Sequence, residues 1–179
     1  YYDYATGTDI TAAVTGSGWD TPAVSPRLYR RIWVEVTPLT AARSNSCFAA
    51  LIAATSLGDG TVKDTVKAST TCLPTHRPDG LIYNGSVYLG DDVYNTSGAG
   101  QTHAISVATG RSAVYHIRFY NDGNLTESYR ITGPSGSSAW QVKYYDYATG
   151  TDITGAVTGA GWVSPTLSPR LYRRLVTEV

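Results

Sequence analysis

The sequence predicts an all-β protein built as an antiparallel β-sandwich. Roughly nine or ten short segments alternate apolar and polar residues, as strands with one face in a core do. Turn-forming Gly, Pro, Asn and Asp residues separate these segments at intervals typical of sandwiches. The composition agrees, because Tyr (14 residues), Thr and Ser suit half-wet strands. No segment has a convincing pattern for a long α-helix.

A 36-residue segment occurs twice. Tyr1–Val36 returns as Tyr144–Val179 with a constant offset of 143, and 27 of the 36 positions are identical. A repeat of this fidelity is typical of tandem-repeat proteins. We therefore expect either a window cut from a longer array or a processed subunit with the same segment at both ends.

Net charge and hydropathy exclude some classes of partner. The chain carries 14 basic and 14 acidic residues, which argues against nucleic acid and anionic membranes as partners. No apolar run approaches the roughly 18 residues that a membrane-spanning helix needs.

The repeated segment contains two expected strands. Trp140–Tyr147 alternates clearly, and the first copy begins inside the equivalent strand. Arg31–Thr37 is the second strand, with Ile32, Val34 and Val36 on one face. Between the two lies a connection, Ala5–Pro26, in which glycines and prolines permit only a loop or a short helix around Ile10–Val14.

The middle of the chain predicts a hairpin. Phe48–Ser56 is apolar on both faces, which predicts a buried strand, and Asp59-Gly60 is a strong two-residue turn signal. Pairing about this turn places Cys47 opposite Cys72. We therefore expect a disulfide between neighbouring strands, which would also imply export from the cytosol.

The remaining elements follow in order. Proline and Asp-Gly predict a linker over Leu73–Gly80, and Asn84-Gly85 predicts a second hairpin that pairs Ile82 with Val87. Short strands are expected at Asp92–Tyr94 and Thr102–Val107. A long strand is expected at Ala113–Tyr120, and the chain then turns at 122–124 and returns through Tyr129 and Ile131.

A family resemblance rests on motifs in a fixed order. These are Arg77–Ile82 (RPDGLI), Gly90–Thr96 (GDDVYNT), Tyr115–Asn124 (YHIRFYNDGN), Trp140–Asp146 (WQVKYYD), Thr151–Thr154 (TDIT), Val34–Pro38 (VEVTP) and Val66–Thr71 (VKASTT). They resemble the Ig-like, CARDB-like β-sandwich repeats of large bacterial and archaeal extracellular proteins. Two features depart from that pattern: the basic stretch Ser25–Arg31, and cysteines at 47 and 72 where apolar residues are usual.

The resemblance implies an Ig-like sandwich whose units are incomplete within this chain. Residues 1–72 would be the C-terminal half of one repeat, 73–80 a linker, and 81–179 most of the next repeat. Neighbouring chains or repeats would complete each unit by strand addition. The strands expected to take part carry Ile32, Val34 and Val36, or their counterparts Leu175 and Val179.

No residue constellation predicts catalysis, a resident metal or a cofactor. The three histidines, at 76, 103 and 116, lack partners at metal-ligand spacing. Asp91, Asp92 and Asn95 form a polar loop with too few carboxylates for a good calcium site. Asn84, Asn95 and Asn124 begin glycosylation sequons in expected turns.

Two function classes remain. The first is a structural subunit of an extracellular fibre or cell-surface stalk, whose partners are identical subunits joined head-to-tail into a helical homopolymer. The second is an adhesin or carbohydrate-binding module within a tandem-repeat surface protein. The tyrosines at positions 1, 2 and 4 and their copies suit either class, since they can line an interface or stack on sugars.

Overall fold

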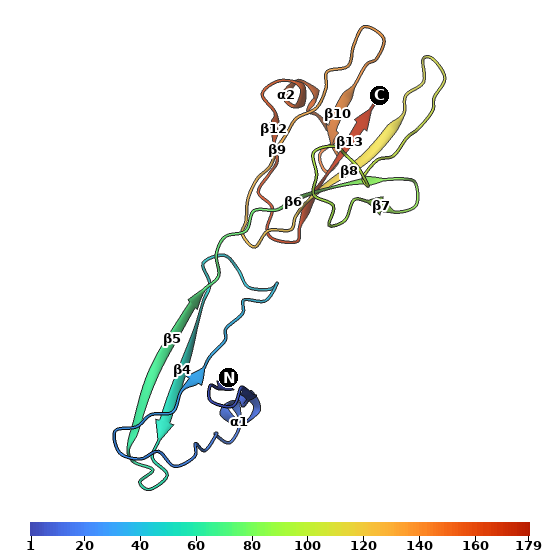
Figure 1. Cartoon of the computed structure of the whole chain (residues 1–179). Coiled ribbons are helices and arrows are strands. Elements are labelled where there is room, and N and C mark those ends of the chain that lie inside the picture. Colours follow the sequence, from blue (N-terminus) through green and yellow to red (C-terminus); the bar gives the residue numbers. More distant parts are fainter. The chain divides into compact units, whose positions relative to one another are not determined.

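The regular secondary structure is mainly antiparallel β-strands, in a computed structural model that describes residues 1–179 (Figure 1). The all-β, antiparallel prediction is confirmed. The chain divides into two units, Tyr1–Leu39 and Thr40–Val179, and each is described by itself. The predicted boundary after residue 72 therefore differs from the observed division after Leu39.

The smaller unit is a three-stranded sheet with a short helix. Its sheet order is β2-β1-β3, and its elements are β1 (Tyr2–Asp3), β2 (Thr8–Asp9), α1 (Thr11–Thr15) and β3 (Ile32–Trp33). The turn between β1 and β2 needs Gly7, which has a φ of +68°. The short helix falls where the sequence permits one, because Gly16 and the prolines beyond it prevent a longer helix.

The larger unit is organised around a six-stranded sheet in the order β11-β10-β13-β8-β6-β7. Its strands are β6 (Pro78–Tyr83), β7 (Tyr88–Leu89), β8 (Val114–Asn121), β10 (Lys143–Asp146), β11 (Thr151–Asp152) and β13 (Tyr172–Glu178). The predicted strand Ala113–Tyr120 is confirmed as β8, which lies in the middle of the sheet.

The core of the larger unit lies on one face of this sheet. It joins sheet residues to the helix α2 (Thr154–Thr158) and to a two-stranded ribbon of β9 (Arg130–Ile131) and β12 (Trp162–Val163). The buried cluster is Ile131, Val142, Tyr144, Ile153, Val157 and Leu175, with Phe119, Trp162 and Val179 packed against it. Leu175 and Val157 are each only 1% exposed, so they sit at its centre.

The hairpin of β4 (Cys47–Thr55) and β5 (Lys63–Thr71) differs from expectation in two ways. Phe48 and Leu51 are 61% and 68% exposed, so the prediction of a buried strand is wrong. The register is also shifted by one residue, because Asp59 accepts hydrogen bonds from Thr61 and so widens the turn. A shift of one residue moves side chains to the opposite face of a strand.

Several other predicted elements need correction. Pro78–Gly80 belongs to β6, so the predicted linker ends earlier. The second hairpin pairs Ile82 with Leu89 rather than Val87, because the Asn84 side chain accepts the N–H groups of Ser86 and Val87 and lengthens the turn.

The strands expected at 92–94 and 102–107 do not form. In the first, Asp92 has a φ of +58°, which is incompatible with a strand. The chain after the 122–124 turn pairs with β12 rather than returning along β8. The strand expected from Trp140 begins at Lys143, because Trp140 closes a turn with Ser137.

Candidate assembly and binding surfaces

The two copies of the repeated segment have the same local structure. Tyr2 pairs with Asp9 and Trp33, and Tyr145 pairs with Asp152 and Val176, so the register is unchanged after the offset of 143. Each copy also contains a five-residue helix at the equivalent position. The segment therefore contains enough information to form its own small sheet.

A buried ion pair holds each copy together. Asp3 accepts bonds from Arg30 and Thr6, and Asp146 accepts the same bonds from Arg173 and Thr149. Both carboxylates are 4% exposed. Burial acts to raise the pKa of Asp146, but hydrogen bonds from Arg173 and Thr149 outweigh it, so the net shift is downward.

The two copies differ in what lies beside their last strand. In the larger unit β13 is seven residues long. On the side away from β10 it pairs with β8, from Tyr172–Tyr120 to Glu178–Val114. In the smaller unit β3 has two residues and forms the edge of its sheet. The predicted strand Arg31–Thr37 is thus realised fully only in the second copy, where a neighbouring strand is present.

The predicted assembly residues fall into two groups. Leu175 is 1% exposed and Val179 packs against the core, so in this structure both are used inside the larger unit. Ile32 is 37% exposed, and Val34 and Val36 are half-buried. The last strand of the segment is therefore an open edge in the first copy only.

Trp19 and Trp162 lie in different surroundings in this structure. Both are half-buried, but Trp162 belongs to β12, pairs with Ile131 and packs against the core. Trp19 lies in an irregular segment. The two tryptophans occupy equivalent positions of the repeated segment, and we expect them to have equivalent surroundings once units are assembled.

The second candidate surface is an array of tyrosine and basic side chains on the sheet of the larger unit. Side chains of β8 alternate, so Arg118 and His116 lie on the face opposite Phe119 and the core. Neighbouring strands add more rings and a second arginine on that side. We call this the tyrosine–arginine face, made of Tyr83, Tyr88, His116, Arg118, Tyr120, Tyr147, Tyr172 and Arg174.

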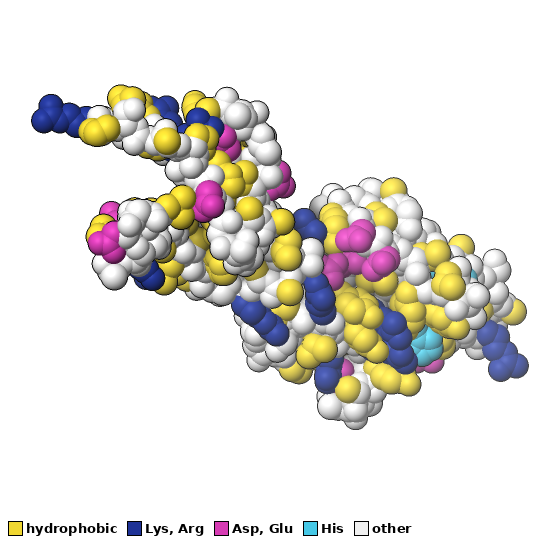
Figure 2. All heavy atoms as spheres, turned by 90° about the horizontal axis from the view of Figure 1, so that it is seen from below, with side chains coloured by type: hydrophobic (Ala, Val, Ile, Leu, Met, Phe, Trp, Pro, Cys, Tyr) yellow, Lys and Arg dark blue, Asp and Glu magenta, His cyan; other side chains and the backbone are white.

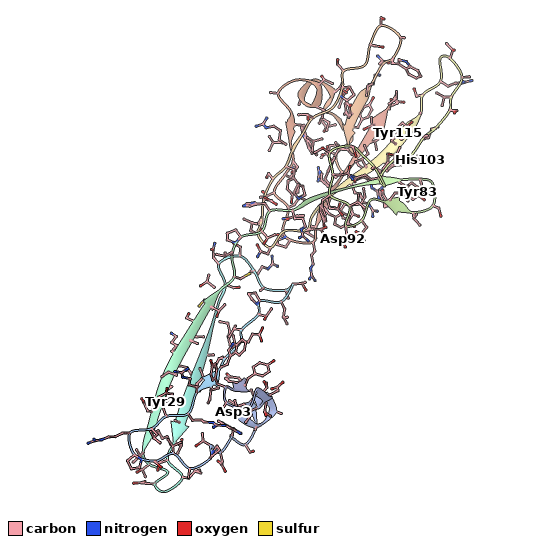
Figure 3. The ribbon with its side chains drawn as sticks, viewed as in Figure 1. Asp3, Tyr29, Tyr83, Asp92, His103 and Tyr115 are labelled. Carbon is pink, nitrogen blue, oxygen red and sulfur yellow. The ribbon has the colours of Figure 1, made fainter.

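The rings and cations of this face contact one another closely. The Arg118 guanidinium lies 3.7 Å from the Tyr88 ring centre and 4.5 Å from that of Tyr172. Arg174 lies 4.2 Å from the Tyr147 ring centre. Figure 2 shows the same kind of arrangement, with Lys and Arg side chains lying among hydrophobic ones over the larger unit. Figure 3 shows Tyr83 at the β6 end of the sheet, and Tyr29 of the smaller unit.

Sequence reasoning missed most of this face. It treated Tyr4 and its copy Tyr147 as stacking or interface residues, and it predicted the strand that carries His116 and Arg118 without assigning them a role. It did not connect β8 with β13, because that pairing joins segments far apart in the chain. One usable signal was present: Tyr29 and Arg31 are unchanged in the second copy although the next three positions all differ.

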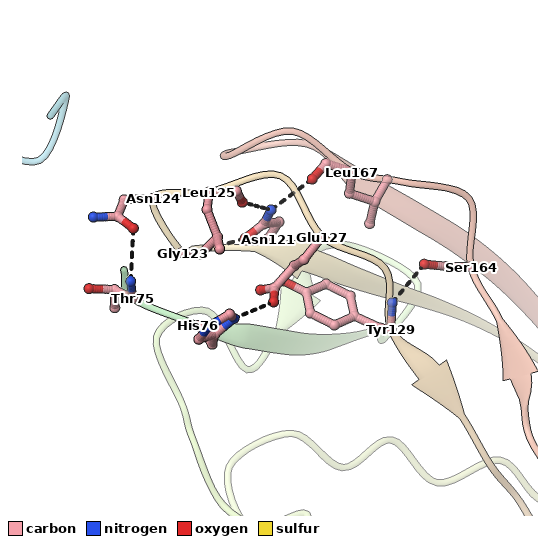
Figure 4. A network of polar contacts seen from close by, with 10 residues as sticks. All are labelled: Thr75, His76, Asn121, Gly123, Asn124, Leu125, Glu127, Tyr129, Ser164 and Leu167. Carbon is pink, nitrogen blue, oxygen red and sulfur yellow. Dashed lines mark hydrogen bonds and ion pairs between the residues drawn. The ribbon is translucent and has the colours of Figure 1, made fainter. Parts of the chain in front are cut away.

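A polar network anchors the turn after β8 (Figure 4). The fully buried Asn121 donates to the carbonyls of Leu125 and Leu167, both at 2.8 Å, and accepts from the Gly123 N–H. His76 contacts Glu127 at 2.7 Å, and Tyr129 donates to the same carboxylate. Every side chain here has an intramolecular partner, so the network acts as structure.

An open cavity of about 890 Å³ lies next to the core side of β6 and β8. Gly80, Ile82, Ile117 and Phe119 line one side, and Val93–Thr96 the other. Its walls are mainly apolar, and no charged side chain other than Arg77 and His76 borders it. Nothing in its lining identifies a ligand.

The two cysteines are free. Cys47 pairs in register with Thr71, not Cys72, so the pairing that motivated the disulfide is wrong. Cys47 Sγ lies 3.0 Å from Ser69 Oγ, whereas Cys72 Sγ accepts a 3.3 Å bond from Asn124 Nδ2. Hydrogen bonds from Ser69 and Thr71 lower the pKa of the exposed Cys47 thiol.

The three sequons differ in how free their amide nitrogens are. Asn95 Nδ2 donates to Ala99, and Asn124 Nδ2 donates to Leu73 as well as to Cys72. The Asn84 side chain forms hydrogen bonds only through its oxygen, which accepts from the N–H groups of Ser86 and Val87. Its Nδ2 has no intramolecular acceptor. Among the predicted glycosylation sites, Asn84 is therefore the one whose modification breaks no bond.

The described chain contains no group of three His, Cys, Asp or Glu side chains arranged to hold a metal ion. It also contains no helix long and apolar enough to cross a membrane. Comparison with protein-family models, with curated proteins and with solved structures gave no match.

Proposed function

We propose that this chain is a repeating structural unit of an extracellular fibre or cell-surface stalk, built from Ig-like β-sandwiches. One observation carries the proposal. The same 36-residue segment occurs once with its neighbouring strands in place and once with its edge open. In a tandem array every unit ends with the same segment, so that segment recurs at a fixed offset, as it does here.

The larger unit indicates what would cover the open edge. There the closing segment lies against β8, which pairs with seven consecutive residues of β13. It also lies against β9, whose Ile131 joins the same core. The natural complement of Tyr1–Val36 is therefore another copy of residues 73–143, supplied by a neighbouring repeat or a neighbouring subunit.

The second copy is already covered, because Tyr144–Val179 pairs with the complementary strands that lie in the larger unit. The first copy has no such strands beside β3. We infer that the head-to-tail contact uses the first copy, through Ile32, Val34 and Val36, and pairs it with complementary strands of a further repeat.

The driving force for this contact is burial plus backbone pairing. Complete burial of one aliphatic side chain contributes about 1.5–3 kcal/mol, and an added strand satisfies an open row of N–H and C=O groups. A head-to-tail contact does not close on itself, so it extends into a filament. An obligate contact of this kind should bury about 2,000 Å² or more.

A fusion protein tests the proposal. A second copy of residues 40–143 is placed ahead of Tyr1, so that the first closing segment has its own complement. Hydrogen exchange of the amides at 30–36 should then slow to the rates at 173–179. The matched control carries Ile→Asp at the copy of Ile117, which pairs with Leu175 in the larger unit. Unchanged exchange at 30–36 in the unmodified fusion contradicts the proposal.

A binding module is the second candidate, favoured by a different observation. The tyrosine–arginine face combines ring surfaces with cations that have no acidic partner in the chain. Buried structural faces seldom keep unpaired charges, because desolvation penalises them. Extracellular adhesins and carbohydrate-binding modules bind their ligands with surfaces of aromatic and polar groups. This second candidate therefore also places the protein outside the cell, but gives it a ligand to bind.

A further inference from the structure

Two arginines lie directly opposite each other on neighbouring strands. Arg118 of β8 and Arg174 of β13 form a cross-strand pair on the tyrosine–arginine face. Like charges at such positions repel and destabilise a sheet. The chain's ion pairs involve Arg30, His76 and Arg173, so neither Arg118 nor Arg174 has an acidic partner.

The Nε atoms of Arg118 and Arg174 are shielded from water and have no hydrogen-bond acceptor, and Nδ1 of His116 also has no partner. The Nε atoms of Arg30 and Arg173 lack an acceptor too, although both of those arginines have a carboxylate partner. What distinguishes Arg118 and Arg174 is therefore the absence of a counter-charge. An anion resting between the two arginines would supply that missing charge.

The acidic side chains on this face are engaged elsewhere. Glu178 lies opposite Lys143 and is within 3.5 Å of the Tyr145 hydroxyl. Asp79 lies opposite Tyr120 and is 1% exposed; its Oδ2 accepts from the Asp92 N–H, and its Oδ1 has no hydrogen-bond partner. Neither carboxylate bonds to an arginine of the face, so the missing anion does not come from the chain's own strands.

Stacking holds the arginines in place. Arg118 lies between the rings of Tyr88 and Tyr172, and Arg174 lies over Tyr147. A guanidinium stacked on rings keeps its N–H donors at its edge, in a planar fork that matches a carboxylate or sulfate. Holding the side chains in advance reduces the entropy lost on binding.

The repeat preserves half of this arrangement. Tyr4, Tyr29 and Arg31 correspond to Tyr147, Tyr172 and Arg174, and all three are identical in the two copies. Arg31 lies 5.4 Å and 5.2 Å from the ring centres of Tyr4 and Tyr29. The three positions that follow Arg31 all change, so the stacked set persists where the strand itself varies.

We propose that the tyrosine–arginine face binds an acidic polysaccharide, with a carboxylate or sulfate group held between Arg118 and Arg174. Tyr147 and Tyr172, which are 52% and 40% exposed, offer ring surface to the sugar. An acidic peptide offers the same anion but no flat apolar ring to lie on tyrosine. This inference rests on the binding-module candidate and is independent of the structural role.

Titration of the full chain with four polymers tests the inference. Polygalacturonate supplies carboxylates, heparin supplies sulfates, dextran is neutral, and polyglutamate is an acidic peptide. Calorimetry should detect binding of one or both acidic polysaccharides, weakened at higher salt as surface charges are screened. Arg118→Gln and Arg174→Gln should each weaken it at least tenfold, and Arg31→Gln should weaken it less.

The matched control is Arg111→Gln, which removes the same charge from an exposed turn outside the face. Equal weakening by this variant, or no binding of either acidic polysaccharide, overturns the inference. Equal binding of polyglutamate overturns the sugar assignment. Equal binding of dextran overturns the anion site but leaves the binding-module function standing.

A second measurement needs no substitution. The Nε–H resonances of Arg118 and Arg174 in the wild-type chain should shift on addition of the bound polysaccharide, whereas that of Arg111 should not. If Arg118→Gln fails to fold, this measurement still decides the matter. Binding without a shift at either arginine places the ligand elsewhere and contradicts the inference.

Discussion

At the scale of single residues, the buried Asp146–Arg173 pair links stability to pH. The carboxylate is 4% exposed and bonds to Arg173 and Thr149. Burial acts to raise the pKa of Asp146, but those bonds outweigh it, so the folded-state pKa lies below the ordinary value of 3.8. Its stabilising contribution is therefore complete above pH 3.8 and is lost as pH falls through the folded-state pKa.

We expect Asp146→Asn to lower the free energy of unfolding at pH 7 by about 3 kcal/mol, because it leaves Arg173 without its partner charge. The difference from wild type should shrink at pH 3, because the unfolded-state carboxylate protonates below its ordinary pKa of 3.8 and so reduces the stability that the charged pair provides. Urea unfolding followed by tryptophan fluorescence at both pH values measures this. Asp3→Asn, the same change in the first copy, is the control and should leave unfolding of the larger unit unchanged. An equal difference at both pH values contradicts the prediction.

The two thiols should differ in reactivity. Cys47 is exposed, and hydrogen bonds from Ser69 and Thr71 lower its pKa, so more of it is thiolate at neutral pH. Cys72 is partly buried and accepts a bond from Asn124. We expect iodoacetamide to modify both cysteines under non-reducing conditions, with Cys47 reacting first. Recovery of an unmodified chain with a Cys47–Cys72 bridge would contradict the structure.

At the scale of elements, the same sequence position has different energetic weight in the two copies. Leu175 is at the centre of the core, and its counterpart Ile32 is 37% exposed. The difference arises from β8, which pairs with β13 in the same sheet. No equivalent strand lies beside β3. Packing partners, rather than the segment itself, therefore determine how much each strand contributes to stability.

Paired truncations measure that difference. Leu175→Ala should lower the free energy of unfolding by about 2–5 kcal/mol, as for a fully buried aliphatic residue. Ile32→Ala should lower it by less than about 1 kcal/mol, because its side chain is already partly in water. Urea unfolding of the two variants against wild type makes the comparison. Similar losses for both would mean that the first copy has partner strands in solution.

At the scale of the whole molecule, the chain comprises a small unit and a large one. Tyr1–Leu39 has few buried side chains, and units below about 40 residues seldom hold together alone. The larger unit has a contiguous core. Their repeated segments have nearly the same sequence, so differences between them report on tertiary environment.

We expect amides of the first copy to exchange hydrogen at least about 100-fold faster than the same amides of the second copy, since open edges exchange through small local fluctuations. The 27 identical positions act as an internal control for intrinsic rates. Exchange by mass spectrometry on dilute chain gives the comparison, with sedimentation velocity to show that the chain is monomeric. Equal protection in the monomer contradicts the prediction.

Much of the local structure followed from short-range signals. The strand at 114–121, the turn after it and the short helix near Ile10–Val14 all lie close to their predicted places. Hairpin registers did not, because the side chains of Asp59 and Asn84 widened turns that Asp-Gly and Asn-Gly suggested would be tight. Burial of Phe48–Ser56 also failed as a prediction, since an apolar pattern does not reveal what covers it.

The sequence by itself determined that the protein is antiparallel and all-β, and that one segment occurs twice and forms the same local structure. The alternation of apolar and polar residues and the repeat at an offset of 143 are visible in the sequence without knowledge of which strands pair. Only the tertiary structure decided that Leu175 is buried while Ile32 is open, and that Arg118 meets Arg174 across β8 and β13. Both outcomes depend on β8, a strand distant in sequence that pairs with β13 but has no counterpart beside β3. The 27 identical residues are the same in both copies, so they cannot specify which strand pairs with them.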